Sequence, residues 1–221
     1  MNATLSGIYD AILDGDVPGT QDRVQAAIAA DLKPGDILSE GMVAAMREVG
    51  RRFEEGDYYV PEMLVAARAM QAGLSLLRPC LVAGDVQSAG KVAIGTVKGD
   101  LHDIGKNLVK LMLEGAGFEV QDLGVDVAPE KFVEAISAGD VDIVAVSALL
   151  TTTMPHMKTT IEAIEQAGLR DKVKIIVGGA PLTQGYATEI GADGFSADAS
   201  SAPVLVESLL QAMTDRAPKS Q

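Results

Sequence analysis

The segment Lys98–Asn107 holds a histidine, His102, close to two carboxylates, Asp100 and Asp103. A neutral imidazole is a good ligand for a transition metal. A carboxylate that hydrogen-bonds the other ring nitrogen fixes the tautomer and makes the ligand more basic, and Asp100 or Asp103 could do this. Gly105 lets the following helix start close to a bulky ligand. The segment therefore predicts a metal site with a single histidine ligand.

The same local sequence also fits a loop histidine at a helix start, with Asp103 as the N-cap residue. A structural zinc site is a poor fit, because such a site takes four ligands. The segment matches neither a Gly-x-Gly-x-x-Gly turn nor a Gly-Lys-Ser/Thr phosphate loop. The second histidine, His156, lies in a separate loop, and we interpret it as exposed near a helix start.

Two other loops favour small or hydroxylic residues. One is Ser147–Thr153, and the other is Gly178–Ala180. Small residues leave room for a ligand beside the backbone. Ordinary turn chemistry explains each loop equally well when it is taken alone.

All three loops follow predicted strands. The apolar patterns predict strands at 91–97, 118–123, 141–147, 173–177 and 194–196, and helices at 104–115, 129–138, 155–167, 183–190 and 202–213. Strands that alternate with helices imply a parallel sheet covered on both faces. Five such units fit an α/β domain of the flavodoxin-like (Rossmann-type) doubly wound kind, in which ligands lie beyond the carboxyl ends of the strands.

The first part of the chain has apolar residues at helical spacing throughout. Its predicted helices include 21–32, capped by Thr20, then 34–53 and 61–77, each beginning at a proline. Four helices with short turns indicate a four-helix bundle. Turn formers at 84–90 mark the predicted boundary between a helical cap domain, 1–88, and a ligand-binding domain, 89–221.

The composition limits the class of protein. No apolar run approaches the roughly 20 residues that span a bilayer, and the N-terminus does not resemble a secretory signal. The net charge of −13 repels nucleic acid and acidic membranes, so neither is expected as a partner. The chain has one cysteine, Cys80, which cannot form an internal disulfide. These features predict a protein of the reducing cytoplasm.

Taken together, the three loops resemble a known signature. The pattern Asp100-x-His102-x-x-Gly105, followed by Ser147-x-Leu149 and Gly178-Gly179, is similar to that of the cobalamin-binding domain. Cobalamin-dependent methionine synthase, corrinoid methyltransferase proteins and several mutases share that domain. Residues 49–62, which read VGRRFEEGDYYVPE, resemble the helical cap of the corrinoid methyltransferase proteins. The resemblance covers residues 35–212.

The resemblance implies a cofactor and a role for each matched residue. The cofactor is cobalamin, as methylcobalamin or a related corrinoid, and His102 ligates its cobalt. Asp100 hydrogen-bonds the distal ring nitrogen, and the Thr153 hydroxyl, where methionine synthase has Ser, completes the relay. Other implied cofactor contacts are Gly99, Leu101, Asp103, Ile104, Gly105, Ser147, Leu149, Thr151, Gly178, Gly179 and Ala199, with Phe53, Val60 and Met63 of the cap at the upper face. Plain bundle core is an alternative for Phe53 and Val60.

The function that the resemblance implies is methyl transfer in one-carbon metabolism. The chain would be a non-autonomous corrinoid subunit. It would accept a methyl group from a substrate-specific methyltransferase and pass it to an acceptor methyltransferase that acts on a pterin or a thiol. A reductive activase would restore oxidised cobalt. The alternative is a cobalamin-dependent sensor, whose cap carries a Trp-x-x-x-Glu-His motif, whereas this chain has no Trp.

Overall fold

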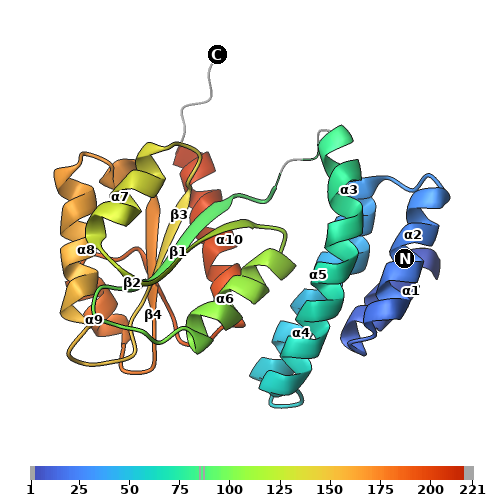
Figure 1. Ribbon diagram of the computed structural model, residues 1–221, viewed down its shortest axis with the longest axis horizontal. Coiled ribbons are helices and arrows are strands. Elements are labelled where there is room, and N and C mark those ends of the chain that lie inside the picture. The colour runs from blue at the N-terminus through green and yellow to red at the C-terminus, as the bar shows by residue number, and fades with distance from the viewer. Residues whose placement is uncertain (1–2, 85, 87, 217–221) are drawn as a thin grey trace. The chain divides into compact units, whose positions relative to one another are not determined.

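The computed structural model describes residues 3–84, 86 and 88–216 of the chain (Figure 1). The chain divides into two compact units, Met1–Ala89 with Leu111–Phe118, and Gly90–Lys110 with Glu119–Gln221. Residues 85 and 87 of the predicted boundary segment lie outside the described residues. The domain boundary between residues 88 and 89 stays a prediction.

Residues 3–84 of the first unit form four helical rods (Figure 1). The third rod is continuous and has a π-helical middle. The elements are α1 (Ala3–Leu13), α2 (Val17–Ala29), the run of α3 (Pro34–Asp36), η1 (Ile37–Val43) and α4 (Ala44–Glu54), and α5 (Val60–Ala83). The core consists of aliphatic and methionine side chains, among them Ile8, Ile12, Met42, Met46, Met63, Met70 and Leu77. This unit confirms the predicted four-helix bundle.

Three predicted helix ends in this unit were wrong: the two ends of α2, which spans Val17–Ala29 and not 21–32, and the end of α5. The side chain of Asp16 caps α2 by accepting a hydrogen bond from the Gly19 N–H at 2.9 Å. Thr20 instead lies buried inside the helix, where its hydroxyl donates to the Asp16 carbonyl. Helix α5 continues to Ala83, beyond the predicted end at residue 77, because its apolar face continues to the buried Leu81.

The second unit is built on a five-stranded sheet that is parallel throughout, in the order β2-β1-β3-β4-β5. This order is the flavodoxin-like one, so the predicted fold class is confirmed. The strands are β1 (Lys91–Val97), β2 (Glu119–Val127), β3 (Ile143–Ser147), β4 (Lys174–Gly178) and β5 (Gly194–Ser196).

Helices cover both faces of the sheet (Figure 1). Helices α7, α8 and α9 pack on one face, where Phe132, Ile161 and Ile190 join the strands in one apolar cluster. Helices α6 and α10 lie on the other face (Figure 1). The helices of this part of the chain are α6 (Ile104–Gly115), α7 (Pro129–Ser137), α8 (Pro155–Gln166), the short η2 (Arg170–Lys172), α9 (Gln184–Glu189) and α10 (Ser201–Arg216).

Edge strand β2 runs to Val127, four residues beyond its predicted end. The pairing of β1 with β2 shifts register on both sides of Gly95, so two irregularities absorb extra residues of β2. Gly124 and Asp126 have φ values of 92° and 53°. Glycine and aspartate adopt such positive φ values more readily than most other residues. The longer strand brings its end beside the loop that follows β1.

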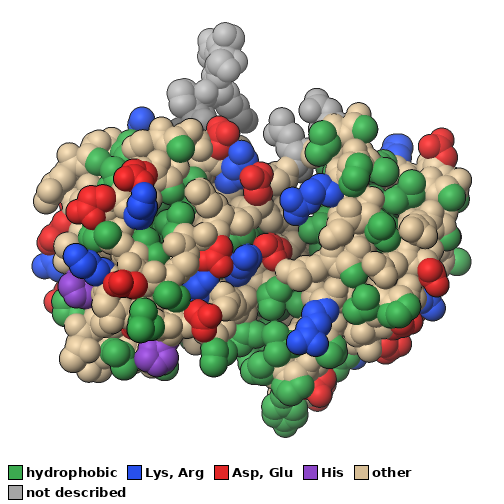
Figure 2. Space-filling model, viewed as in Figure 1, with side chains coloured by type: hydrophobic (Ala, Val, Ile, Leu, Met, Phe, Trp, Pro, Cys, Tyr) green, Lys and Arg blue, Asp and Glu red, His purple; other side chains and the backbone are tan. Residues whose placement is uncertain are grey.

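None of the described helices is long and apolar enough to cross a bilayer. On the face seen in Figure 2, acidic and basic side chains are interspersed within each unit rather than gathered by sign. This view therefore shows no basic tract that would offset the net charge of −13.

Candidate cofactor site

The carboxyl ends of four strands meet in one row across the sheet. Thr96 of β1 pairs with Ser147 of β3, Ser147 pairs with Gly178 of β4, and Gly178 pairs with Ser196 of β5. Every residue in this row is small or hydroxylic. The loops predicted to carry chemistry after β1, β3 and β4 therefore leave the sheet at the same edge.

His102 lies in the loop after β1, with its side chain 52% exposed. Its Nδ1 atom lies 3.0 Å from Oδ1 of Asp100. The backbone N–H of His102 donates to the same oxygen, also at 3.0 Å. The loop therefore bends so that the imidazole and its own backbone share one carboxylate oxygen.

The second oxygen of Asp100 is held by the loop after β3. Oδ2 accepts from the Thr153 hydroxyl at 2.6 Å and from the N–H groups of Leu149 and Leu150 at 2.8 and 3.3 Å. Asp100 is fully buried. Burial alone would raise the pKa of the Asp100 carboxyl, but the hydrogen bonds from Thr153, Leu149 and His102 outweigh it and hold the pKa well below its usual range.

An ionised Asp100 settles the tautomer of His102. A carboxylate can only accept, so Nδ1 of His102 carries a proton, and the lone pair of the neutral imidazole lies on Nε2. Asp103, the other candidate partner, precedes α6 and accepts instead from the Asn107 amide at 3.2 Å. The geometry therefore favours Asp100 as the partner of Nδ1, and it leaves Nε2 of the half-exposed imidazole as the candidate metal ligand.

The surroundings of His102 suit a large, flat and mainly apolar ligand. Leu101 and Ile104 are 72% and 76% exposed, and Leu149 and Leu150 also reach solvent. A Cβ added at Gly105 would meet no atom within 4 Å. Exposed apolar side chains on two adjacent loops mark a ligand surface, and they fit a corrin ring placed against the imidazole.

Gly179 lets the loop after β4 approach the loop after β3. It has a φ of 142°, and an added Cβ would lie 1.8 Å from the Ala148 carbonyl oxygen. Its neighbour Gly178 would place a Cβ 3.3 Å from the Ser196 carbonyl oxygen. Only glycine fits the first position without moving the backbone. Both residues were predicted to contact the cofactor.

The other predicted contact residues lie around the same edge. Gly99 is exposed with a φ of 80°, Ser147 is half-buried and Thr151 is exposed in the turn after β3. Ala199 is buried just before α10. The structure thus brings the predicted residues of the second unit to one edge of the sheet, and their contacts with a cofactor stay predictions.

Three predicted residues belong to the helical unit. Phe53 lies half-buried near the end of α4, Val60 is 39% exposed at the start of α5, and Met63 is buried in the bundle. Phe53 and Val60 flank the turn that joins the two helices. Their placement over the upper face of a cofactor stays a prediction.

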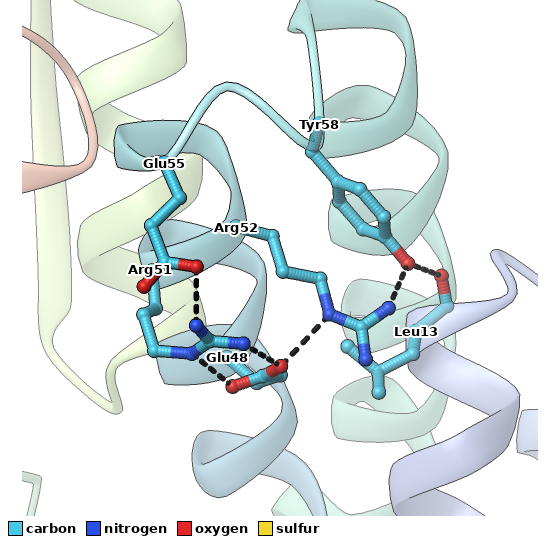
Figure 3. A network of polar contacts seen from close by, with 6 residues as sticks. All are labelled: Leu13, Glu48, Arg51, Arg52, Glu55 and Tyr58. Carbon is cyan, nitrogen blue, oxygen red and sulfur yellow. Dashed lines mark hydrogen bonds and ion pairs between the residues drawn. The ribbon is translucent and has the colours of Figure 1, made fainter.

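A polar network holds that turn (Figure 3). Arg52 of α4 donates to Glu48 at 2.8 Å and to the Tyr58 hydroxyl at 2.9 Å. The guanidinium also lies 5.1 Å from the centre of the Tyr58 ring, and the Tyr58 hydroxyl donates to the Leu13 carbonyl of α1. Hydrogen bonds from Arg51 and Arg52 lower the pKa of Glu48 to about 2. The network ties the turn to two helices of the bundle.

Sequence reasoning missed the residues that hold the His102 loop to the sheet. The Thr96 hydroxyl donates to the His102 carbonyl at 2.9 Å. Asp126 of β2 accepts from the Gly99 N–H at 2.7 Å, and its own N–H donates to the Asp100 carbonyl at 3.0 Å. No local pattern pointed to these residues, because their roles depend on strand pairing.

A buried ion pair fixes the first turn of α6. The side chain of Lys106 is only 2% exposed, and its ammonium donates to Asp122 of β2 at 2.7 Å and to Asn107 at 2.8 Å. Burial raises the pKa of the Asp122 carboxyl, but hydrogen bonds from Lys106 and the Gly124 N–H outweigh it, so the net pKa is lowered. Edge strand β2 thus holds the loop on both sides of His102.

Fold and site together define a class of protein: a flavodoxin-like domain, joined to a helical bundle, that presents among apolar side chains a histidine predicted to ligate a metal. A profile of the B12 binding domain matches residues 90–205, and a second profile with the same description matches residues 4–78. The chain belongs to the family of B12-binding corrinoid proteins. The predicted family and its cobalt-containing corrinoid cofactor are confirmed.

Several corrinoid proteins are similar to this chain over nearly its whole length. Dimethylamine corrinoid protein 3 of Methanosarcina acetivorans is 40% identical, covering 94% of this chain and 99% of its own length. Trimethylamine corrinoid protein 2 of the same organism is 45% identical, covering 87% and 90%. The methanol:cobalamin methyltransferase complex MtaBC of Methanosarcina barkeri contains a similar structure, with a TM-score of 0.84, 28% identity and coverage of 95% and 80%.

Asp100→Asn is expected to destabilise the cofactor-free protein. All five donors face carboxylate oxygens, so either orientation of the amide sets its NH₂ group against N–H or O–H donors. We expect the free energy of unfolding in urea to fall by about 2–3 kcal/mol. The control is Asp142→Asn. In the wild-type protein, the Asp142 carboxylate accepts a single hydrogen bond of this kind, from the backbone N–H of Lys91. Equal losses in the two variants would contradict the special role of Asp100.

Asp122→Asn should destabilise the protein in a pH-dependent way. The folded-state pKa of Asp122 is lowered, so its stabilisation is full above the ordinary pKa of about 4 and is lost as pH falls through the folded-state pKa. We expect a loss on the order of 2 kcal/mol at pH 7, less than for a fully buried pair, and a smaller loss at pH 3. Urea unfolding at both pH values measures this.

Glu134→Gln provides the comparison for Asp122→Asn, because Glu134 forms an exposed ion pair with Lys131. That variant should change the free energy of unfolding by less than about 0.5 kcal/mol. A deficit of Asp122→Asn that stays constant between the two pH values would refute the assigned cause.

Proposed function

We propose that this corrinoid protein carries methyl groups taken from a methylated amine. The support comes from the relatives: two proteins named for dimethylamine and trimethylamine are 40% and 45% identical to this chain. The structure that belongs to a methanol-specific complex is 28% identical. All of these similarities extend over both units, so the higher identity of the amine-named relatives favours an amine as the source of the methyl group.

One observation carries the methyl-carrier function: Nδ1 of the half-exposed His102 imidazole lies 3.0 Å from an oxygen of the buried Asp100 carboxylate, which leaves Nε2 as the nitrogen that would ligate a metal. When bound, the corrinoid supplies a cobalt centre that accepts and releases a methyl group. Gly99, Leu101, Ile104 and Leu149 would surround it, while Gly178 and Gly179 would line the slot for its tail.

The residues of the chain have two tasks: they hold the proton at Nδ1 of His102, and they exclude water from the bound cofactor. Asp100 holds a proton at Nδ1, and the Thr153 hydroxyl, 2.6 Å from the other carboxylate oxygen, sets how strongly Asp100 accepts it. The exposed leucine and isoleucine side chains of the two loops would exclude water from the lower face. Phe53 and Val60 would shield the upper face.

The proposal requires protein partners. One methyltransferase would bring the methylated substrate, and a second would accept the methyl group on a pterin or a thiol. A reductive activase would restore oxidised cofactor. The methanol-specific neighbour is part of a methyltransferase complex, which supports the first of these partners. The proposed compartment is the cytoplasm, consistent with a single cysteine that has no disulfide partner in the chain.

Reconstitution with aquocobalamin tests the metal ligand. We expect the wild-type protein to bind it and to show the visible absorption of imidazole-ligated cobalt. His102→Ala should lose that signature, whereas His156→Ala should keep it, because His156 lies on α8 rather than in the loop after β1. An identical spectrum in wild type and His102→Ala would show that another group ligates the metal.

Coupled assays with purified methyltransferases test the methyl donor. Transfer to a thiol acceptor should depend on this protein when a dimethylamine- or trimethylamine-specific methyltransferase is supplied, and it should be at least tenfold slower with a methanol-specific one. His102→Ala serves as the negative control. Faster transfer with the methanol enzyme would overturn the amine assignment while leaving the carrier function intact.

A further inference from the structure

Thr96 is the last residue but one of β1, and it is fully buried. Its hydroxyl does not bond to a neighbouring strand. It donates across the loop to the backbone carbonyl of His102 at 2.9 Å, six residues further along the chain. A hydroxyl inside the sheet therefore contacts the residue that carries the ligating imidazole.

Both backbone polar groups of His102 are thus occupied. Its N–H donates to Asp100 Oδ1 at 3.0 Å, and its carbonyl accepts from Thr96. The start of the loop is held separately, by the two hydrogen bonds that Asp126 makes with Gly99 and Asp100. Beyond His102, the next anchor is the buried ammonium of Lys106. Between Asp100 and Lys106, among the hydrogen bonds of the described residues, the one from Thr96 links the loop to the sheet core.

We propose that Thr96 is a positioning residue for the metal ligand His102. The inference rests on the proposed function, in which that imidazole binds the cobalt. Asp100 fixes the tautomer and the direction of the ring, but Asp100 lies on the same loop. Thr96 lies on a strand whose flanking strands, β2 and β3, hold it on both sides. The Thr96 hydroxyl therefore sets how far the His102 backbone stands above the edge of the sheet, and with it the reach of Nε2.

A second threonine separates this role from ordinary stabilisation. Thr160 of α8 is also fully buried, and its hydroxyl donates to the carbonyl of the other histidine, His156, at 2.8 Å. That bond lies within one helix, between residues four apart. The two threonines match in burial, in bond length and in acceptor type. They differ in that only Thr96 contacts the loop after β1.

The test compares Thr96→Val, Thr96→Ser and Thr160→Val in the full chain. Valine keeps the shape of threonine and removes the hydroxyl, while serine keeps the hydroxyl. In the cofactor-free protein, we expect the His102 amide to exchange with solvent about three- to tenfold faster in Thr96→Val, corresponding to one lost hydrogen bond. In Thr160→Val that amide should exchange at the wild-type rate.

With aquocobalamin added, Thr96→Val should bind about three- to tenfold more weakly, and a larger share of the bound cofactor should lack the imidazole-ligated absorption. Thr96→Ser should restore both values to near wild type, and Thr160→Val should leave both unchanged. This pattern would support a positioning role, because a general loss of stability would affect both valine variants.

Wild-type affinity and absorption in Thr96→Val would overturn the inference while leaving the proposed function standing, as long as His102→Ala still loses the signature. Equal effects of Thr96→Val and Thr160→Val would also overturn it, because they would show a structural role alone. If the wild-type protein shows no imidazole-ligated absorption at all, the proposed function fails, and the role of Thr96 fails with it.

Discussion

The site depends on one buried carboxylate, that of Asp100. Its two oxygens accept from five donors, which come from two loops separated by about fifty residues in the chain. An ionised group without water is costly unless its lone pairs are satisfied. Here the donors hold the pKa of the carboxyl well below its usual range, in spite of burial. The tautomer of His102, the path of its loop and the approach of the loop after β3 all follow from satisfying this one group.

The sheet makes that arrangement possible by ending in a row of small residues. Thr96, Ser147, Gly178 and Ser196 occupy neighbouring positions on four strands. Bulky side chains in this row would separate the loops: a Cβ at Gly178 would already lie 3.3 Å from the Ser196 carbonyl oxygen. At the next residue, Gly179, a Cβ would lie only 1.8 Å from the Ala148 oxygen. The chain thus favours close contact between loops over the additional apolar burial that larger residues would provide at this edge.

Much of the architecture could be predicted from local patterns. The bounds of α6 and β5 match the sequence prediction, because each element lies between clear turn or apolar signals. The end of β2 could not be predicted, since Gly124 and Asp126 normally mark a turn and only the irregular pairing with β1 keeps them in the strand. The cap of α2 was missed because Asp16 and Thr20 are both good capping residues and the choice depends on Pro18.

In the candidate site, too, some residues could be predicted from the sequence and others could not. Residue types pointed to His102 with Asp100 or Asp103, and the family resemblance implied Asp100 and Thr153. The structure brings His102, Asp100 and Thr153 together. Thr96, Asp126 and the pair of Lys106 with Asp122 were not found, because each acts through strand register or across the edge of the sheet. Short sequence motifs identify the residues that contact a ligand. The residues that hold these ligand-contacting residues in place are spread along the chain.

The distance along the chain between Asp100 and Thr153 has a consequence for assembly. Their contact exists only once β1 and β3 lie side by side, so a chain that has not completed its sheet has no organised histidine to offer. A cofactor that binds only the finished domain shifts the folding equilibrium by about 2.7 kcal/mol when its free concentration is a hundred times its dissociation constant. Cobalamin would then stabilise only correctly folded molecules. When cobalamin is scarce, a larger fraction of this protein would be unfolded.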